Sequence, residues 1–279
     1  MDPVRVSLPA PASTVGAALL ESCAQWIRDV TQTVPRLLAF TLITLGTLLT
    51  KAGHARGVMY PILTQQLFRT GARLVPMICL LGLMLGLVVV GQSIALLQKF
   101  GAANLTGILL VTVVIRELSP LIAALTVLAR VGTASVVELG TARSQGEVEA
   151  LESIGVDPIH YLVVPRVIAF TVSVMALAVY LVLTTLLGGY VFAFTRGLPL
   201  TFTQYLGHIA GSLVWLDFPL LALKTGLFGG LIGMVICYQG LAQPIRLEEV
   251  GAATTRTVTL CGVGCLLIDA VFVPLYLVL

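Results

Sequence analysis

The chain contains 279 residues, of which 58% are hydrophobic and only 10% are charged, and its mean hydropathy is +1.03. A water-soluble domain of this length needs more charged surface, so the composition excludes one and predicts a chain that is mostly helix inside a lipid bilayer. The formal net charge is only +3, and the basic residues are not gathered into one stripe. A nucleic-acid partner is therefore not expected.

The first 68 residues precede the long apolar segments. Residues 1–13 contain three prolines and are expected to be disordered. Residues 14–68 are expected to form an interfacial or re-entrant helical region, because the apolar run at 37–49 is shorter than the ~20 residues that a membrane span needs. The apolar run at 15–20 lacks the basic segment of a signal peptide, so the chain is expected to insert through its internal helices.

Five longer apolar segments follow, and each is predicted to cross the membrane. The third is too long for one perpendicular span, so it must tilt or project into water. The predicted fold class is an all-α polytopic membrane protein, with an N-terminal interfacial or re-entrant helix, five transmembrane helices and one large domain over residues 69–279. The five segments run approximately over residues 74–97, 105–128, 161–194, 213–237 and 258–279.

The placement of lysine and arginine predicts the orientation, because cytoplasmic loops of membrane proteins are enriched in these residues. With the N-terminus in the cytoplasm, twelve basic residues lie on the cytoplasmic side, seven of them before the first span. Only Lys99 and Arg196 lie on the opposite side, and Arg116 and Lys224 lie inside spans. We therefore expect a cytoplasmic N-terminus and a C-terminus on the far side of the membrane.

Glycines recur at four-residue spacing in the first and fourth predicted spans. In lipid, this spacing allows two helix backbones to approach closely, so it predicts tight helix packing at these positions. The alternative is that the spacing has no structural role, since glycine is frequent in membrane spans. The glycines concerned are Gly82 and Gly86 in the first span and Gly226, Gly229, Gly230 and Gly233 in the fourth.

Arg116 and Glu117 stand in the second predicted span, where each charged side chain costs ~3 kcal/mol or more. Neighbours on a helix point about 100° apart, so each of the two needs its own partner or a wet cavity. Lys224 and Asp269 lie at comparable depth in the fourth and fifth spans. Two interpretations fit equally well: an ion-pair network that joins the helices, or the polar floor of a cavity that binds a charged or zwitterionic head group.

The connection between the second and third spans holds an acidic segment at residues 138–157. Val148, Leu151 and Ile154 recur at three-residue spacing and form one apolar stripe, which glutamates flank. An acidic helix is disfavoured at the anionic cytoplasmic leaflet. A protein partner therefore fits this segment better than a lipid surface.

Several motifs are missing from the sequence. It has no GxxxxGK[ST] phosphate-binding loop and no GxSxG nucleophile elbow, and its five cysteines and three histidines lack the spacing of a metal site. No catalytic residue, bound metal or cofactor is expected in this chain, so it is not expected to be an enzyme. If it takes part in ATP-driven transport, the ATPase must be another chain.

Three blocks of sequence resemble the signature of the MlaE (YrbE) permease family. The first is IRELSP at 115–120 with ARVG at 129–132, the second is the acidic segment with its continuation to residue 166, and the third is ATTRTV at 253–258 with Asp269 downstream. They occur in the family's order from about residue 68 to the end of the chain. By this resemblance, residues 69–279 are an MlaE-type permease domain, and the acidic segment at about 138–157 is its cytoplasmic coupling helix, docked on the ATPase.

The resemblance implies a permease subunit of an ABC transporter in the bacterial inner membrane, with its C-terminus in the periplasm. Such a permease moves phospholipids between this membrane and a periplasmic MCE-domain carrier, which maintains the lipid asymmetry of the outer membrane. It implies a homodimer with two cytoplasmic ATPase subunits that use ATP, an MCE-domain hexamer and often a STAS-domain protein. The alternative is a permease of the same architecture that exports small hydrophobic molecules or solvents.

The resemblance also implies roles for individual residues. Ser119 departs from the glycine expected for the family, and Ser93 and Ile94 stand where a tyrosine is common. A head-group or gating role is favoured for the Arg116–Glu117 pair, and a structural ion pair with Lys224 or Asp269 stays open. The expected lipid-binding residues are Val89, Leu96, Leu97, Phe100, Arg116, Glu117 and Leu118. The expected ATPase-coupling residues are Glu138, Gly140, Glu147, Leu151 and Asp157.

Overall fold

The computed structural model describes residues 35–47, 56–100, 106–195, 201–242 and 250–278, and within them every regular element is a helix. The all-α prediction is confirmed. The chain divides into two units, Met1–Ile43 and Thr44–Leu279. A short apolar helix covers Pro35–Thr47, and its length agrees with the expectation that residues 37–49 are too short to span a membrane. The prediction for residues 1–13 lies outside the described residues, as do residues 14–34 and 48–55 of the region predicted at 14–68.

Among the described residues, five helices are long and apolar enough to cross a membrane, which confirms the predicted number of spans. They are Tyr60–Leu97, Gly107–Ser144, Ile159–Thr195, Asp217–Leu241 and Gly251–Tyr276. The first three have 37 or 38 residues. At 1.5 Å per residue they are about 56 Å long, whereas the hydrocarbon core of a bilayer is about 30 Å thick. Each of these three helices must therefore tilt or extend into water.

The first long helix consists of successive helical segments. It runs through residue 69, the first residue of the predicted permease domain. Arg69 and Arg73 precede the apolar segment that begins at Leu74, but arginine is a good helix former, so the helix extends through them. The segments are α2 (Arg56–Thr70), η1 (Ala72–Leu74), α3 (Val75–Leu85), the π-helical η2 (Gly86–Val90) and α4 (Gly91–Lys99).

The second long helix continues well past residue 128, where the predicted span ends. Its extension carries exposed charged residues such as Arg130, but Val136 and Leu139 are buried in the bundle, so the extension is amphipathic rather than apolar. The segments are α5 (Thr106–Leu109), the π-helical η4 (Leu110–Leu118), α6 (Ser119–Val127), the π-helical η5 (Leu128–Gly132) and α7 (Thr133–Ser144), and the short α8 (Glu147–Ser153) follows.

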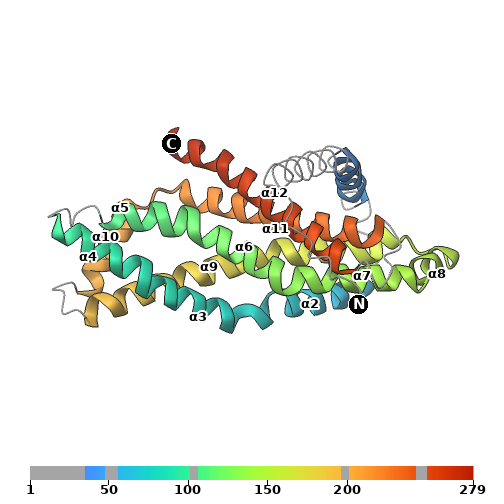
Figure 1. Ribbon diagram of the computed structural model, residues 1–279, viewed down its shortest axis with the longest axis horizontal. Coiled ribbons are helices and arrows are strands. Elements are labelled where there is room, and N and C mark those ends of the chain that lie inside the picture. The colour runs from blue at the N-terminus through green and yellow to red at the C-terminus, as the bar shows by residue number, and fades with distance from the viewer. Residues whose placement is uncertain (1–34, 48–55, 101–105, 196–200, 243–249, 279) are drawn as a thin grey trace, which may run out of the picture. The chain divides into compact units, whose positions relative to one another are not determined.

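Within the second unit, α9 packs against α2, α3, α6 and α11 (Figure 1). By contrast, α12 packs mainly on α11 and α7. Only 17% of the most apolar stretch of α12 is buried, compared with 50% for α11, so most of α12 is left to lipid or to another subunit. The elements of this second half are η6 (Ile159–Val163), α9 (Val164–Thr195), α10 (Phe202–Ser212), α11 (Asp217–Ala242) and α12 (Val250–Val278).

Glycines of the first long helix bring it close to α9, as their spacing predicts. A side-chain carbon added to Gly82 would meet the hydroxyl of Thr184. A carbon added to Gly86 would meet the backbone of Thr185. Any larger residue at these positions would push α3 and α9 apart, so the small residues set the distance between the helices.

The four glycines of α11 differ in their surroundings. A carbon added to Gly229 would lie 2.6 Å from the Cα of Thr171 on α9, and one added to Gly233 would also meet α9 backbone, at 3.0 Å. At Gly226 and Gly230 the nearest atoms are 3.6 and 3.7 Å away, which is ordinary van der Waals contact. Only the Gly229–Gly233 pair is therefore required for the close approach of α11 to α9.

The helix α10 packs against one end of the first two long helices. A capping box starts it, in which Thr201 N donates a hydrogen bond to Gln204 Oε1 at 3.1 Å. The hydroxyl of Tyr205 donates to the Leu186 carbonyl oxygen at 3.2 Å, and burial raises the pKa of this phenol. Tyr205 and Ile209 join a buried cluster with side chains of η2, α4, η4 and α9. This cluster fixes the helix end from which η4 enters the bundle.

Candidate functional site

Lys224 on α11 is fully buried and joins three helices. Its ammonium nitrogen lies 3.0 Å from Glu117 Oε2 on η4 and 2.6 Å from Asp269 Oδ1 on α12. It also donates a hydrogen bond to the carbonyl oxygen of Arg116 at 2.8 Å. Two donors of the ammonium group therefore make hydrogen bonds, to Glu117 and to the Arg116 carbonyl, and Asp269 adds an ion-pair contact.

Arg116 points to a different partner. Its Nε lies 2.9 Å from Oδ1 of Asp217, an ion-pair distance, and its guanidinium carbon lies 5.0 Å from the centre of the Tyr276 ring. Asp217 is the first residue of α11, and its Oδ2 accepts a hydrogen bond from Val214 N at 2.9 Å. A carboxylate at a helix N-terminus is stabilised by the helix dipole. Arg116 is thus anchored at the end of α11, whereas Lys224 lies two turns further along that helix.

We call these five side chains, Arg116, Glu117, Asp217, Lys224 and Asp269, the ion network. As helix geometry requires, the two neighbouring charged residues on η4 diverge and each finds its own partner. The π-helical stretch Leu110–Leu118 contains both of them, and such stretches are frequent at functional sites. The structure therefore brings together the four charged residues singled out in the sequence and adds Asp217 to them.

The ion network is not sealed on all sides. The side chains of Lys224 and Asp217 are 0% and 5% exposed, but that of Glu117 is 29% exposed in the single chain. With every group ionised, two cations face three carboxylates, which leaves one negative charge in excess. The buried hydroxyl of Tyr276 has no hydrogen-bond partner among the described residues. The network therefore ties the helices together, and its accessible group is the Glu117 carboxylate.

The apolar residues expected to bind lipid occupy η2, α4 and the residue that follows α4. Leu96 and Phe100 are 54% and 82% exposed in the single chain, and Val89 and Leu97 are half-buried. Leu118 is half-buried beside the charged pair. The two exposed residues leave an apolar surface that a lipid or a second copy of the chain can cover.

The acidic segment at 138–157 is not one continuous helix. It breaks at Gly146, whose φ of 77° is a left-handed conformation that favours glycine. Glu138 and Gly140 therefore lie on α7, whereas Glu147 and Leu151 lie on α8. Asp157 follows α8, and its Oδ1 accepts a hydrogen bond from the backbone N of Ile159, at the start of the third long helix.

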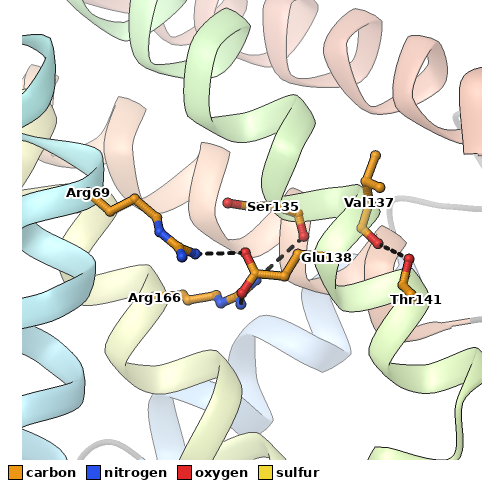
Figure 2. Close-up of polar contacts among 6 residues, drawn as sticks. All are labelled: Arg69, Ser135, Val137, Glu138, Thr141 and Arg166. Atoms are coloured by element: carbon orange, nitrogen blue, oxygen red, sulfur yellow. Dashed lines mark hydrogen bonds and ion pairs between the residues drawn. The ribbon is translucent and has the colours of Figure 1, made fainter.

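The five expected coupling residues have different surroundings. Glu138 bridges two arginines: its Oε2 lies 3.0 Å from Arg69 Nη1 and its Oε1 lies 2.8 Å from Arg166 Nη2 (Figure 2). Gly140 is buried, Leu151 is half-buried, and Glu147 is exposed. Ile154, the last residue of the predicted apolar stripe, is also exposed, at 72%. The surface open to a partner is therefore α8 with the turn after it.

Sequence reasoning missed several charged and polar contacts. Asp217 does not stand out in the sequence, because acidic residues are common at the start of helices. Tyr276 does not stand out either, because aromatic residues are common near the ends of membrane spans. Their contact with Arg116 depends on three-dimensional packing. A signal was present for Asp217, since Arg116 needed a carboxylate and few acidic residues border the apolar segments. Among the described residues, no group of three side chains could hold a metal ion.

Five apolar helices that enclose an ion network define a multi-pass membrane protein with charge held inside it. The family model described as "Permease MlaE" matches residues 63–275. Because this match covers well over half of the sequence, the chain belongs to the MlaE permease family and is a transporter permease.

Individual relatives agree with this assignment. The chain is 32% identical over 197 residues to a "Probable ABC transporter permease protein" of Rickettsia felis, which covers 71% of this chain and 76% of the relative. It is 30% identical over 212 residues to "Protein TRIGALACTOSYLDIACYLGLYCEROL 1, chloroplastic" of Arabidopsis thaliana, covering 74% and 59%. It is also 30% identical over 130 residues to the "Intermembrane phospholipid transport system permease protein MlaE" of Haemophilus influenzae, covering 47% and 50%.

Proposed function

We propose that this permease moves phospholipids as the membrane subunit of an ABC transporter in a bacterial inner membrane. It works as a homodimer with two cytoplasmic ATPase subunits, which bind and hydrolyse ATP. Lipid passes between this membrane and a periplasmic MCE-domain hexamer, and a STAS-domain protein can complete the complex. The outcome is maintenance of outer-membrane lipid asymmetry. The name of the Haemophilus influenzae relative, an intermembrane phospholipid transport system permease protein, supports this choice of substrate.

The observation that carries the proposal is the partly accessible ion network inside an apolar bundle. A phospholipid combines a charged head group with two acyl chains, so its site needs a polar end and an apolar wall. Glu117 supplies an accessible carboxylate, which when ionised favours the cationic part of a zwitterionic head group. Leu96 and Phe100 supply exposed apolar surface on the first long helix.

The second long helix connects this site to the coupling region. The helix Gly107–Ser144 carries the charged pair near one end and α7 at the other. A movement of α8 against the ATPase would pass across the turn at Gly146 to α7, and from there along the second long helix to Glu117. Head-group contacts that exist in only one arrangement of the helices would favour that arrangement while lipid is bound. Their loss in the other arrangement would release the lipid.

The test is transfer of labelled phospholipid by the complete complex in proteoliposomes. Glu117→Gln removes the accessible charge, and we expect slower transfer and less copurifying lipid while ATP hydrolysis continues. Thr112→Val is a matched control, because Thr112 is exposed on the same π-helical stretch and forms no part of the network. Unchanged transfer and unchanged copurifying lipid in Glu117→Gln would remove the ion network from the lipid path.

The second candidate function is export of small hydrophobic molecules by the same architecture. The exposed apolar residues on the first long helix fit such a substrate as well as an acyl chain. The two functions differ in their need for charge. The substitution Glu117→Gln should leave the transport of an uncharged solvent unchanged, and it should slow the transport of phospholipid.

A further inference from the structure

A second polar region lies at the other end of the apolar part of the first two long helices. There a cavity of ≈ 540 Å³ opens between the α2–α3 region and the η5–α7 region. Its polar lining includes Arg69, Arg73, Arg130 and Glu138, and its apolar lining includes Leu74 and Met77. We call it the basic cavity. A volume of this size is in the usual range for small-ligand sites.

Positive charge in the basic cavity exceeds negative charge. Among the residues that the structure describes, Glu138 is the one carboxylate that lines it, and both oxygens of this group are already paired, one with Arg69 and one with Arg166 (Figure 2). Arg73 and Arg130 have no carboxylate partner among the described residues. Counting Arg166, four cations share one carboxylate, so an anion would be attracted to the cavity.

Arg130 shows most clearly that a partner is missing. Its Nε lies 3.4 Å from the sulfur of Met77, and a thioether is only a weak hydrogen-bond acceptor. A guanidinium group has five N–H donors arranged in a fork that matches the oxygens of a phosphate. Arg130 therefore keeps most of its donors available for a ligand.

The position of the cavity indicates where an anion would come from. Arg73 directly precedes the apolar segment that begins at Leu74, and Arg130 follows the apolar run that ends at residue 128 of the antiparallel helix. The two arginines thus mark the same edge of the apolar belt. Phosphate groups of membrane lipids lie at this depth, while acyl chains lie beside the apolar residues.

We propose that the basic cavity binds the phosphate of an anionic phospholipid, with Arg73 and Arg130 as its ligands and Leu74 and Met77 against the first carbons of its acyl chains. By the predicted orientation, this lipid belongs to the cytoplasmic leaflet. A soluble phosphate ester would satisfy the same arginines but would leave the apolar lining uncovered. The proposal depends on the membrane-spanning fold and not on the transported substrate.

The experiment is a titration of the purified full-length chain in detergent with dioleoylphosphatidylglycerol, with bound lipid counted by native mass spectrometry. The double variant Arg73→Gln/Arg130→Gln should bind this lipid about tenfold more weakly or worse, since charge-assisted hydrogen bonds are lost. Both side chains are exposed, so the fold should persist in the double variant. The single variant Arg73→Gln should show a smaller loss of lipid affinity.

Three comparisons make the result specific. Arg143→Gln removes the same charge from the same helix outside the cavity and should bind like the unchanged chain. Inorganic phosphate and dioleoylglycerol, which represent the head and the tails alone, should each fail to displace the phospholipid. The proposal is overturned if the double variant binds normally, if Arg143→Gln weakens binding equally, or if inorganic phosphate displaces the lipid. Glu117→Gln should keep this binding, which separates the test from that of the transport function.

Discussion

The ion network and the basic cavity lie on the same long helix, but their charges are balanced differently. Arg116 and Arg130 are 14 residues apart, which is about 21 Å along a helix. In the ion network, two cations meet three carboxylates around a lysine that is 0% exposed. In the basic cavity, four cations share one carboxylate, and Arg69 and Glu138 are about half exposed.

This difference follows from burial. A charge with no access to water must be paired inside the protein, because leaving it alone costs several kcal/mol. A charge at the edge of the apolar belt can remain unpaired, because water or a lipid phosphate can reach it. The ion network therefore holds the helices together, whereas the exposed Arg73 and Arg130 of the basic cavity can be changed with little effect on the fold.

The largest effect is expected from Lys224→Met. The substitution leaves Glu117 and Asp269 facing one another without their shared cation, and loss of one partner from a buried ion pair typically costs 3–5 kcal/mol. Thermal unfolding of the purified chain should show a strong loss of stability. The triple variant Lys224→Met/Glu117→Gln/Asp269→Asn removes all three charges and should recover much of it. Normal stability of Lys224→Met alone would mean that the three groups are not packed as described.

A smaller effect is expected from Gly229→Ala, which moves the helix that carries Lys224 without altering any charge. The new methyl group would lie 2.6 Å from the Cα of Thr171, and such overpacking typically costs about 1–3 kcal/mol. Gly230→Ala is the matched control, because its nearest atom is 3.7 Å away, and it should unfold at nearly the normal temperature. Equal effects of the two alanines would contradict the assigned face of α11.

The smallest effect is expected from Arg69→Gln at the basic cavity. The ion pair of Arg69 with Glu138 is about half exposed on both sides, and exposed pairs are typically worth less than about 1 kcal/mol. Glu138→Gln should cost more, because it also leaves Arg166, whose side chain is 6% exposed, without its carboxylate. Unfolding measured at low and high salt separates them: the small effect of Arg69→Gln should fade with salt. A larger loss of stability for Arg69→Gln than for Glu138→Gln would contradict the burial of Arg166 beside Glu138.

Much of the fold could be predicted from the sequence because hydrophobic length is a strong signal in membrane proteins. The five spans follow from it, and the need of Arg116 and Glu117 for separate partners follows from the angle between neighbouring residues on a helix. The ends of the helices could not be predicted from hydrophobic length, because the second long helix continues beyond its apolar run as an amphipathic segment. The break of the acidic segment at Gly146 was missed because glycine next to a polar residue is compatible with both a helix and a turn.

The partners of individual charged groups were less predictable. Lys224 and Asp269 could be proposed from their similar depth alone, but Asp217 reaches Arg116 from the end of a helix. The basic cavity was hidden for a different reason. In the sequence, Arg69, Arg73 and Arg130 counted only as evidence for orientation, and nothing in their spacing shows that two distant segments bring them to one cavity.

The burial of Lys224 has a consequence for how the chain is made. If the helices insert in chain order, Lys224 enters the bilayer on α11 before α12 is inserted, and Asp269 lies on α12. A lysine alone at the centre of an inserting helix costs about 2.5–3.5 kcal/mol, and until then only Glu117 on an earlier helix is available to offset it. The two carboxylates that share this lysine thus arrive at different times during synthesis. The helix α12 completes a charge arrangement that the second long helix began, so the membrane core cannot finish assembling before α12 has been inserted.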